Sequence, residues 1–286
     1  MNKWLKWTLR ILLSGVALYL VFRKIRWQQV EHLLAHAQPW WLIPALIGYN
    51  LSQIVSAARL FIFYRRIPVP LSRRLNLALY YKGMFYNLLL PGGIGGDGYK
   101  VHFLRKKSGQ ALKKLISATL LDRLNGLAAL VLLLVLLSPA IPSKLWSRVM
   151  PFPVWWLIPV YGVLLAVAWQ AAKKYCPTWF PVLPRTTGLS LGVQVLQLAT
   201  VLCLMQAIHT SGPAVAYLWL FLLSGIAAVI PFTIGGAGAR EIVFMAGASL
   251  LGASAAQAVA VSLLFFLLSV LSAWAGAYLS LDDRSL

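Results

Sequence analysis

Long apolar runs alternate with short polar segments along the whole chain of 286 residues. Because a bilayer core about 30 Å thick needs roughly 20 apolar residues per helical crossing, each run of that length predicts one transmembrane helix. Such runs occur near residues 4–22, 39–64, 115–138, 153–172, 187–209 and 255–280. Two further apolar regions, 75–107 and 213–251, are each interrupted by a cluster of glycines. The pattern therefore predicts an all-α polytopic membrane protein with about six crossing helices.

The segment between the first two runs has a different, amphipathic pattern. Within residues 23–38, Val30, Leu33, Leu34 and Ala37 stand at i, i+3, i+4 and i+7, so they form one apolar stripe on a helix. Polar and basic residues occupy most of the other positions. This pattern predicts a short helix that lies in the membrane interface and does not cross the bilayer.

Two glycine-rich segments, one in each broken region, repeat at a spacing of 140 residues. Residues 91–100 and 231–240 both read P-x-x-I-G-G-x-G-x followed by Lys or Arg, without a gap. The order of elements repeats as well, since each half contains two apolar runs, a glycine-broken run and one more apolar run. The repeat predicts a single transmembrane domain over 1–286, made of two structural repeats at about 1–145 and 146–286.

The composition excludes most soluble proteins. Only 11% of the residues are charged and 60% are hydrophobic, whereas an ordinary soluble domain carries about 25% charged residues. This rules out a soluble cytosolic enzyme and a secreted disulfide scaffold. The 26 Lys and Arg against 6 Asp and Glu give a formal charge of +20. Between apolar runs, this excess indicates membrane topology and contact with anionic lipid headgroups, and not nucleic acid binding.

The basic residues are concentrated around the first broken region, since residues 65–114 contain 11 of the 26. Because Lys and Arg are enriched in cytoplasmic loops, both flanks are expected to be cytoplasmic and the region to be a re-entrant hairpin. The second region then opens from the outer face, which gives two opposed hairpins, an inverted repeat and cytoplasmic termini. If both regions cross fully, there are instead eight spans and two parallel halves. Either topology is expected in the inner membrane of a bacterial cell.

The two broken helices are the strongest pointer in the sequence to a binding site. Paired Pro/Gly interruptions at matching positions of two halves mark the substrate sites of transporters. Glycines let the backbone expose N–H groups, and the positive end of the following half-helix attracts an anion such as phosphate. The glycines and the cations after them are Gly95, Gly96 and Lys100 in the first break and Gly235, Gly236 and Arg240 in the second. The alternative is that the glycines only allow close helix packing, with Gly92 and Gly96 as a GxxxG pair.

Three acidic residues, Asp97, Asp122 and Glu241, fall within apolar regions. A charge at the centre of a membrane helix costs about 2.5–3.5 kcal/mol on insertion scales, so each is expected to face a partner or a cavity. Across helices, the expected pairs are Arg240 with Asp97 or Asp122, and Arg123 with Glu241. Alternatively, these charges form structural ion pairs that hold the halves together. Three further residues are expected to line the same cavity: Lys82, Asn87 and Tyr99.

Three segments of this sequence, PGGIGGDGYK, LLDRLNG and IPFTIGGAGARE, resemble a flippase-like membrane family. That family includes the transmembrane domain of lysylphosphatidylglycerol synthases, and the resemblance covers about residues 5–280. It implies a protein that moves phospholipids or polyprenyl-linked sugars between leaflets. The family's motif positions correspond here to Gly95, Gly96, Asp97, Asp122, Arg123, Gly235, Gly236, Arg240 and Glu241. Because the chain ends at Leu286 without a soluble catalytic domain, lipid synthesis is not expected.

The sequence therefore predicts a lipid flippase that is not an enzyme and uses no cofactor or metal. Backbone N–H groups, Lys100, Arg123 and Arg240 are expected to bind the phosphate of an anionic phospholipid or a lipid-linked sugar. The expected partners are these membrane lipids and a lipid-modifying enzyme or glycosyltransferase. Two alternatives remain: a membrane enzyme that acts on a lipid phosphate with Asp97 or Glu241 as general base, and a non-transporting scaffold for a lipid-modifying partner.

Overall fold

The computed structural model describes residues 27–89, 95–229, 238–279 and 281. Within these residues, every regular element is an α-helix or a short 3₁₀ turn. The chain is therefore an all-α membrane protein, as the apolar pattern predicts. The expected first span at 4–22, and Gly235 and Gly236 of the second glycine cluster, lie outside the described residues.

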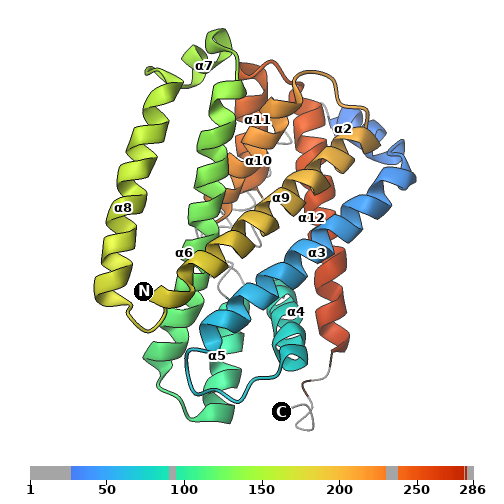
Figure 1. Ribbon diagram of the computed structural model, residues 1–286. Coiled ribbons are helices and arrows are strands. Elements are labelled where there is room, and N and C mark those ends of the chain that lie inside the picture. Colours follow the sequence, from blue (N-terminus) through green and yellow to red (C-terminus); the bar gives the residue numbers. More distant parts are fainter. Residues whose placement is uncertain (1–26, 90–94, 230–237, 280, 282–286) are drawn as a thin grey trace, which may run out of the picture.

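Long apolar helices form the frame of the molecule (Figure 1). They are α3 (Pro39–Tyr64), α6 (Leu112–Leu137), α8 (Leu157–Tyr175), α9 (Leu183–Ala207) and α12 (Ala255–Tyr278). Each is apolar and long enough to cross a bilayer at a rise of 1.5 Å per residue. Their bounds confirm the predicted spans at 39–64, 115–138, 153–172, 187–209 and 255–280. Helices α3 and α9 lie side by side and are inclined against α6 and α12.

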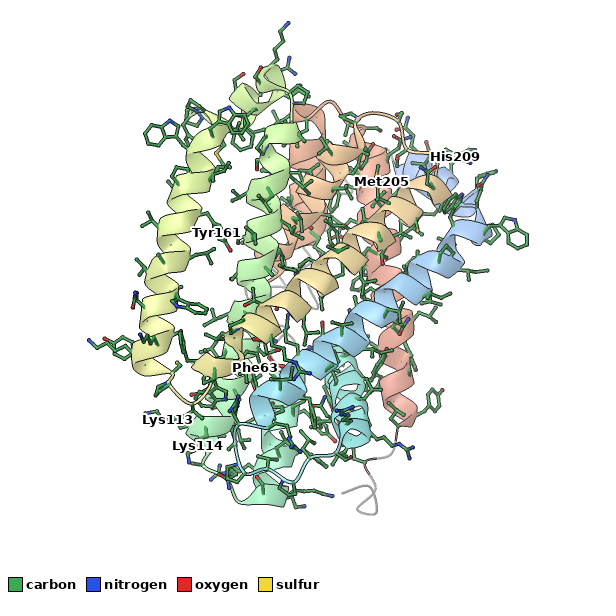
Figure 2. The ribbon with its side chains drawn as sticks, in the orientation of Figure 1. Phe63, Lys113, Lys114, Tyr161, Met205 and His209 are labelled. Atoms are coloured by element: carbon green, nitrogen blue, oxygen red, sulfur yellow. The ribbon has the colours of Figure 1, made fainter. Side chains whose placement is uncertain are left out.

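Helix α8 lies at one edge of the bundle and contacts mainly α6. Tyr161, which Figure 2 shows between these two helices, donates a hydrogen bond to the Ala128 carbonyl. On the rest of α8, Val163, Leu164 and Val167 are largely exposed. An apolar surface of this extent is typical of a face that contacts lipid and not water.

The predicted amphipathic helix is present as α2 (Trp27–Ala35). Val30 is fully buried, and Leu33 and Leu34 pack against the same hydrophobic cluster. Glu31, which lies off this stripe, is exposed. The apolar stripe of α2 therefore packs on the protein, and the helix lies against α12.

Each glycine-broken region forms two shorter helices that pack against each other. The first pair is α4 (Arg73–Leu89) and α5 (Gly95–Ser108), and the second pair is α10 (Ala214–Val229) and α11 (Ala239–Leu250). The connections into and out of the first pair lie at the lower end of the molecule in Figure 1, and those of the second pair lie at the upper end. The other elements are α7 (Ser143–Val149) and 3₁₀ turns at 138–140, 154–156 and 180–182.

Two hydrophobic clusters hold these pairs in place. The lower cluster packs α4 and α5 against α3 and α6 through Phe63, Leu79 and Leu104, each no more than 1% exposed. The upper cluster packs α10 and α11 against α9 and α12, with Tyr217 and Phe244 fully buried. Because lipid is as apolar as these side chains, close van der Waals packing stabilises such helix contacts more than removal from water does.

Candidate functional site

The start of α5 is held against α4 by direct backbone contact. A Cβ atom on Gly96 would lie 1.9 Å from the carbonyl oxygen of Gly83, so only glycine fits there. The Gly96 N–H donates to Oδ1 of Asn87 at 2.7 Å. This N–H, which has no partner inside the helix, is therefore already satisfied by protein. Gly92, the other member of the expected GxxxG pair, lies outside the described residues, and Gly96 itself packs closely against Gly83.

Asp97, in the first turn of α5, forms ion pairs with two cations. Its carboxylate accepts from Lys100 Nζ at 2.7 Å within the same helix and from Arg123 Nε on α6. Asp97 and Lys100 are less than 10% exposed, whereas 36% of the Arg123 side chain is exposed. The predicted pair of Arg123 with Glu241 is wrong, because Arg123 pairs with Asp97. Among the described residues, this cluster therefore contains one carboxylate and two cations.

Asp122 belongs to a separate network of hydrogen bonds between buried side chains. Arg59 of α3 binds it through two bonds, Nε to Oδ1 at 2.7 Å and Nη2 to Oδ2 at 3.1 Å. The remaining Arg59 nitrogen, Nη1, donates to Oγ of Ser190 on α9 at 2.8 Å. The predicted pair of Arg240 with Asp97 or Asp122 is therefore wrong, since both carboxylates bind other cations. Sequence reasoning missed Arg59, although a lone arginine inside the apolar run 39–64 is itself a signal that a buried partner exists.

Glu241 acts as a cap at the start of α11. Its Oε2 accepts from the Gly238 N–H at 2.6 Å, and its Oε1 accepts from Oγ of Ser262 on α12 at 2.9 Å. Gly238 has φ of +89°, a conformation that side-chain-bearing residues rarely adopt. Glu241 is only 2% exposed. Its carboxylate therefore closes the helix end and ties α11 to α12.

Arg240, the neighbour of Glu241, faces a polar cavity of about 280 Å³. Its guanidinium lies over the rings of Phe265 and Phe221, at 5.0 and 5.5 Å from their centroids. No carboxylate of the described residues lies within 4.0 Å of it. The polar residues that line the cavity with it come from α3, α4, α9 and α12, and they are Tyr49, Gln53, Tyr80, Asn87, Gln197 and Ser269. A cation in such a cavity, with no ion-pair partner among the described residues, is suited to bind an anion.

Two side chains of α4 connect this cavity with the Asp97 cluster. Tyr80 lines the cavity, and its ring centroid lies 4.9 Å from Lys100 Nζ. Asn87 also lines the cavity, as expected, and its amide oxygen holds the Gly96 N–H. The side chain of Tyr80 therefore lies between the Arg240 cavity and Lys100, and Asn87 lies between the cavity and the start of α5.

The other two expected lining residues lie elsewhere. Lys82 donates to the backbone carbonyl of Leu279, which follows α12. The ring of Tyr99 stacks on Tyr86, with centroids 4.2 Å apart. Neither Lys82 nor Tyr99 lines the Arg240 cavity.

A second opening reaches the Asp97 cluster from the side of the bundle. It is a groove of about 530 Å³ between α5 and α6, and both Asp97 and Arg123 line it. Its wall is mostly apolar, and Ile116 and Leu120 are 47% and 53% exposed. The Asp97–Arg123 ion pair therefore lies next to an apolar surface of the bundle.

Comparison with known proteins identifies the family. The sequence model described as the lysylphosphatidylglycerol synthase TM region matches residues 7–276, which is nearly the whole chain. No curated protein gives a significant match. The match includes both glycine clusters and every charged residue of the site. The chain therefore belongs to the family of lysylphosphatidylglycerol synthase transmembrane regions.

Proposed function

We propose that this protein moves an anionic lipid, either a phospholipid or a polyprenyl-phosphate-linked sugar, between the leaflets of a bacterial inner membrane. The observation that carries the proposal is Arg240, which faces a polar cavity and has no carboxylate partner among the described residues. In a membrane domain, such a charge is costly unless a ligand or water accompanies it. A lipid phosphate supplies the missing counter-charge.

The connection to the Asp97 cluster suggests a path for the headgroup. Arg123 is the more exposed of the two cations on Asp97 and lines the lateral groove. A phosphate that enters from the groove replaces Asp97 as the partner of Arg123, while Asp97 keeps Lys100. From there the headgroup passes Tyr80 and Asn87 to Arg240. The acyl chains stay outside, against apolar side chains such as Leu120.

The helix pairs support an inverted-repeat transport mechanism. We place α4–α5 and α10–α11 as re-entrant hairpins that open to opposite sides, because their connections lie at opposite ends of the bundle. In this arrangement the basic residues of 65–114 and both termini are cytoplasmic. Opposed hairpins in two related halves allow each face to open in turn around one site. A lipid-modifying enzyme or glycosyltransferase would supply or consume the lipid.

The carboxylate contacts favour binding over acid–base chemistry. Both Glu241 oxygens accept hydrogen bonds that cap α11 and bind α12. Each Asp97 oxygen contacts a cation, Oδ1 with Lys100 and Oδ2 with Arg123, so both are engaged in ion pairs. These contacts suit a site that holds and releases a phosphate without changing the lipid.

Leaflet exchange in proteoliposomes tests the proposal. Fluorescent phosphatidylglycerol and phosphatidylcholine are reconstituted with the wild type, Arg240→Gln, and the matched control Arg148→Gln, whose arginine is exposed on α7. We expect the wild type and control to exchange phosphatidylglycerol faster than phosphatidylcholine, and Arg240→Gln to lose at least about tenfold in rate, since a hydrogen-bonded charge contributes about 1.5–3 kcal/mol. If Arg240→Gln exchanged phosphatidylglycerol as fast as the wild type, Arg240 would not belong to the lipid-binding site.

A further inference from the structure

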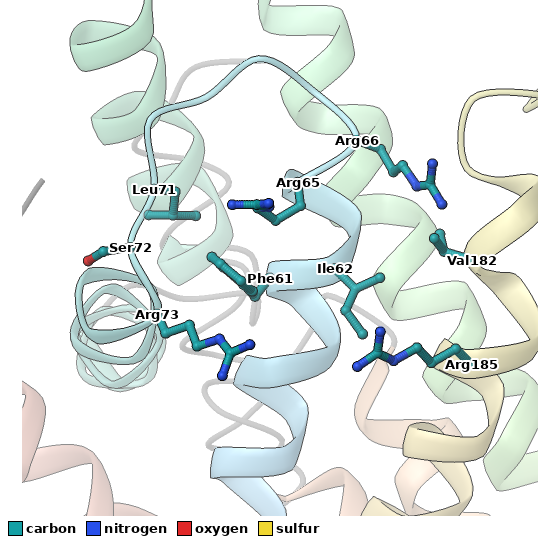
Figure 3. Close-up of a pocket in the computed structure, with 9 residues that line it drawn as sticks. All are labelled: Phe61, Ile62, Arg65, Arg66, Leu71, Ser72, Arg73, Val182 and Arg185. Carbon is teal, nitrogen blue, oxygen red and sulfur yellow. The ribbon is translucent and has the colours of Figure 1, made fainter.

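A second positively charged hollow lies at the lower end of α3 and shares no lining residue with the Arg240 cavity. It has a volume of about 540 Å³ and is lined by four arginines (Figure 3). They are Arg65 and Arg66 after α3, Arg73 at the start of α4, and Arg185 in the first turn of α9. No carboxylate of the described residues lines the hollow or forms an ion pair with these arginines. We refer to it as the arginine bowl.

The fold brings these four arginines together from three segments of the chain. In Figure 3, Arg73 and Arg185 point toward α3 from its two sides, while Arg65 and Arg66 extend from its end. The four arginines are exposed, so solvent screens their mutual repulsion in part, and an anion between them lowers it further. Guanidinium groups bind phosphate oxygens through paired hydrogen bonds, so a phosphate is the matching ligand.

An apolar groove continues from the arginine bowl along α3. It has a volume of about 360 Å³ and shares Phe61, Ile62, Arg73 and Arg185 with the bowl. Its far end is Ile54, which is 43% exposed. From Arg65 to Ile54 the helix rises by about 16 Å at 1.5 Å per residue. That length is close to half of a hydrocarbon core about 30 Å thick, as one acyl chain requires.

One buried polar group of the groove also lacks a partner. Asn76 is 3% exposed and donates from Nδ2 to the Ala57 carbonyl at 2.8 Å. Its Oδ1 accepts no hydrogen bond from any described residue. Asn76 lines the groove next to Arg73. This oxygen is enclosed by protein, so it is not a contact for an acyl chain that lies in the groove.

We infer that the arginine bowl and its groove form a second lipid site, which binds one anionic phospholipid with its phosphate among the arginines and one acyl chain along α3. A free phosphate ion would bind in the arginine bowl, but it has no acyl chain to occupy the groove. The site is separate from the Arg240 cavity, since the two share no lining residue. The inference therefore stands whether or not the protein transports lipid.

Native mass spectrometry of the full chain with added phosphatidylglycerol tests this site. Arg73→Gln/Arg185→Gln removes two charges from the bowl. Its matched control, Lys113→Gln/Lys114→Gln, removes two exposed charges from the same end of the molecule (Figure 2). We expect at least about tenfold weaker phosphatidylglycerol binding in the bowl variant and nearly unchanged binding in the control. Equal losses in both variants would overturn the inference, because they would indicate attraction by overall charge alone.

A groove-blocking variant separates a lipid from a soluble anion. Ala58 is exposed and lines the groove, so Ala58→Trp fills the path of the acyl chain. Ala166→Trp on the exposed face of α8 is the control. We expect Ala58→Trp to weaken phosphatidylglycerol binding and Ala166→Trp to leave it unchanged. Competition by millimolar inorganic phosphate with no effect of Ala58→Trp would instead indicate a soluble-anion site and overturn the inference.

Discussion

The contact between Gly96 and Gly83 makes the α4–α5 pair unusually sensitive to one methyl group. The ideal Cβ of an alanine at position 96 would lie 1.9 Å from the Gly83 carbonyl oxygen, 2.6 Å from its carbon and 2.9 Å from its Cα. Ordinary contacts begin near 3.4 Å. Because all three atoms are backbone, no side chain can turn away. We therefore expect Gly96→Ala to push the two helices apart by roughly 1.5 Å.

Two effects determine how much stability Gly96→Ala loses. Overpacking a close contact costs about 1–3 kcal/mol, and loss of the Gly96 N–H bond to Asn87 adds about 1 kcal/mol. Gly98→Ala is the matched control, because it lies in the same helix and its Cβ would meet nothing within 4 Å. Both variants gain the same helix propensity of about 1 kcal/mol. Gly96→Ala should therefore be less stable than Gly98→Ala by about 2–4 kcal/mol.

Thermal unfolding in detergent, followed by tryptophan fluorescence, measures this difference. At about 2–4 °C per kcal/mol for a chain of this size, the two melting temperatures should differ on the order of 10 °C. If Gly96→Ala and Gly98→Ala have the same melting temperature, α4 and α5 do not make the described contact. The close-packing role of the first glycine cluster would then be refuted.

Three further predictions concern buried charge and topology. Arg59→Met leaves Asp122 buried and unpaired, so it should destabilise the protein by about 3–5 kcal/mol in thermal unfolding. The double variant Arg59→Met/Asp122→Leu should recover most of this lost stability. No recovery in the double variant would contradict the pairing. Glu241→Ala should cost about 1–2 kcal/mol through loss of the α11 cap, and unchanged melting would argue against capping. Single cysteines at Ser72 and Ser108 should react with an impermeant thiol reagent from the same membrane face, and opposite faces would exclude the hairpin.

Much of the architecture could be predicted from the sequence, because its signal is local. A run of about 20 apolar residues is sufficient to predict a crossing helix, and α3, α6, α8, α9 and α12 follow that rule. The spacing of Val30, Leu33 and Leu34 likewise predicts α2. The glycine clusters correctly mark where the shorter helices are interrupted, since α4 ends and α5 begins around the first of them.

The charge pairs could not be assigned in this way, because each joins distant parts of the chain. Asp122 and Arg59 are 63 positions apart and meet only because α3 packs on α6. The charge of Arg59 was visible in the sequence, but its partner was not. The contact of Gly96 with Gly83 is similar, since no pattern distinguishes Gly83 from other glycines of the chain.

Glu241 is a case where a local signal was present and was read differently. An acidic residue three positions after Gly238, at the start of an apolar helix, matches the Glu half of a capping box, since glycine has no side chain to supply the other half. The sequence interpretation instead assigned Glu241 to an ion pair with Arg123. The structure uses the carboxylate at the helix end, and it forms no ion pair with Arg123 or with the adjacent Arg240.

The central claim is that a lipid phosphate lies against Arg240 in the cavity between α3, α4, α9, α11 and α12. A cryo-electron microscopy structure in nanodiscs of phosphatidylglycerol tests it most directly. The account predicts headgroup density within about 4 Å of the Arg240 guanidinium, and its loss in Arg240→Gln. Water alone in the cavity of a protein that still exchanges phosphatidylglycerol between leaflets would contradict the account.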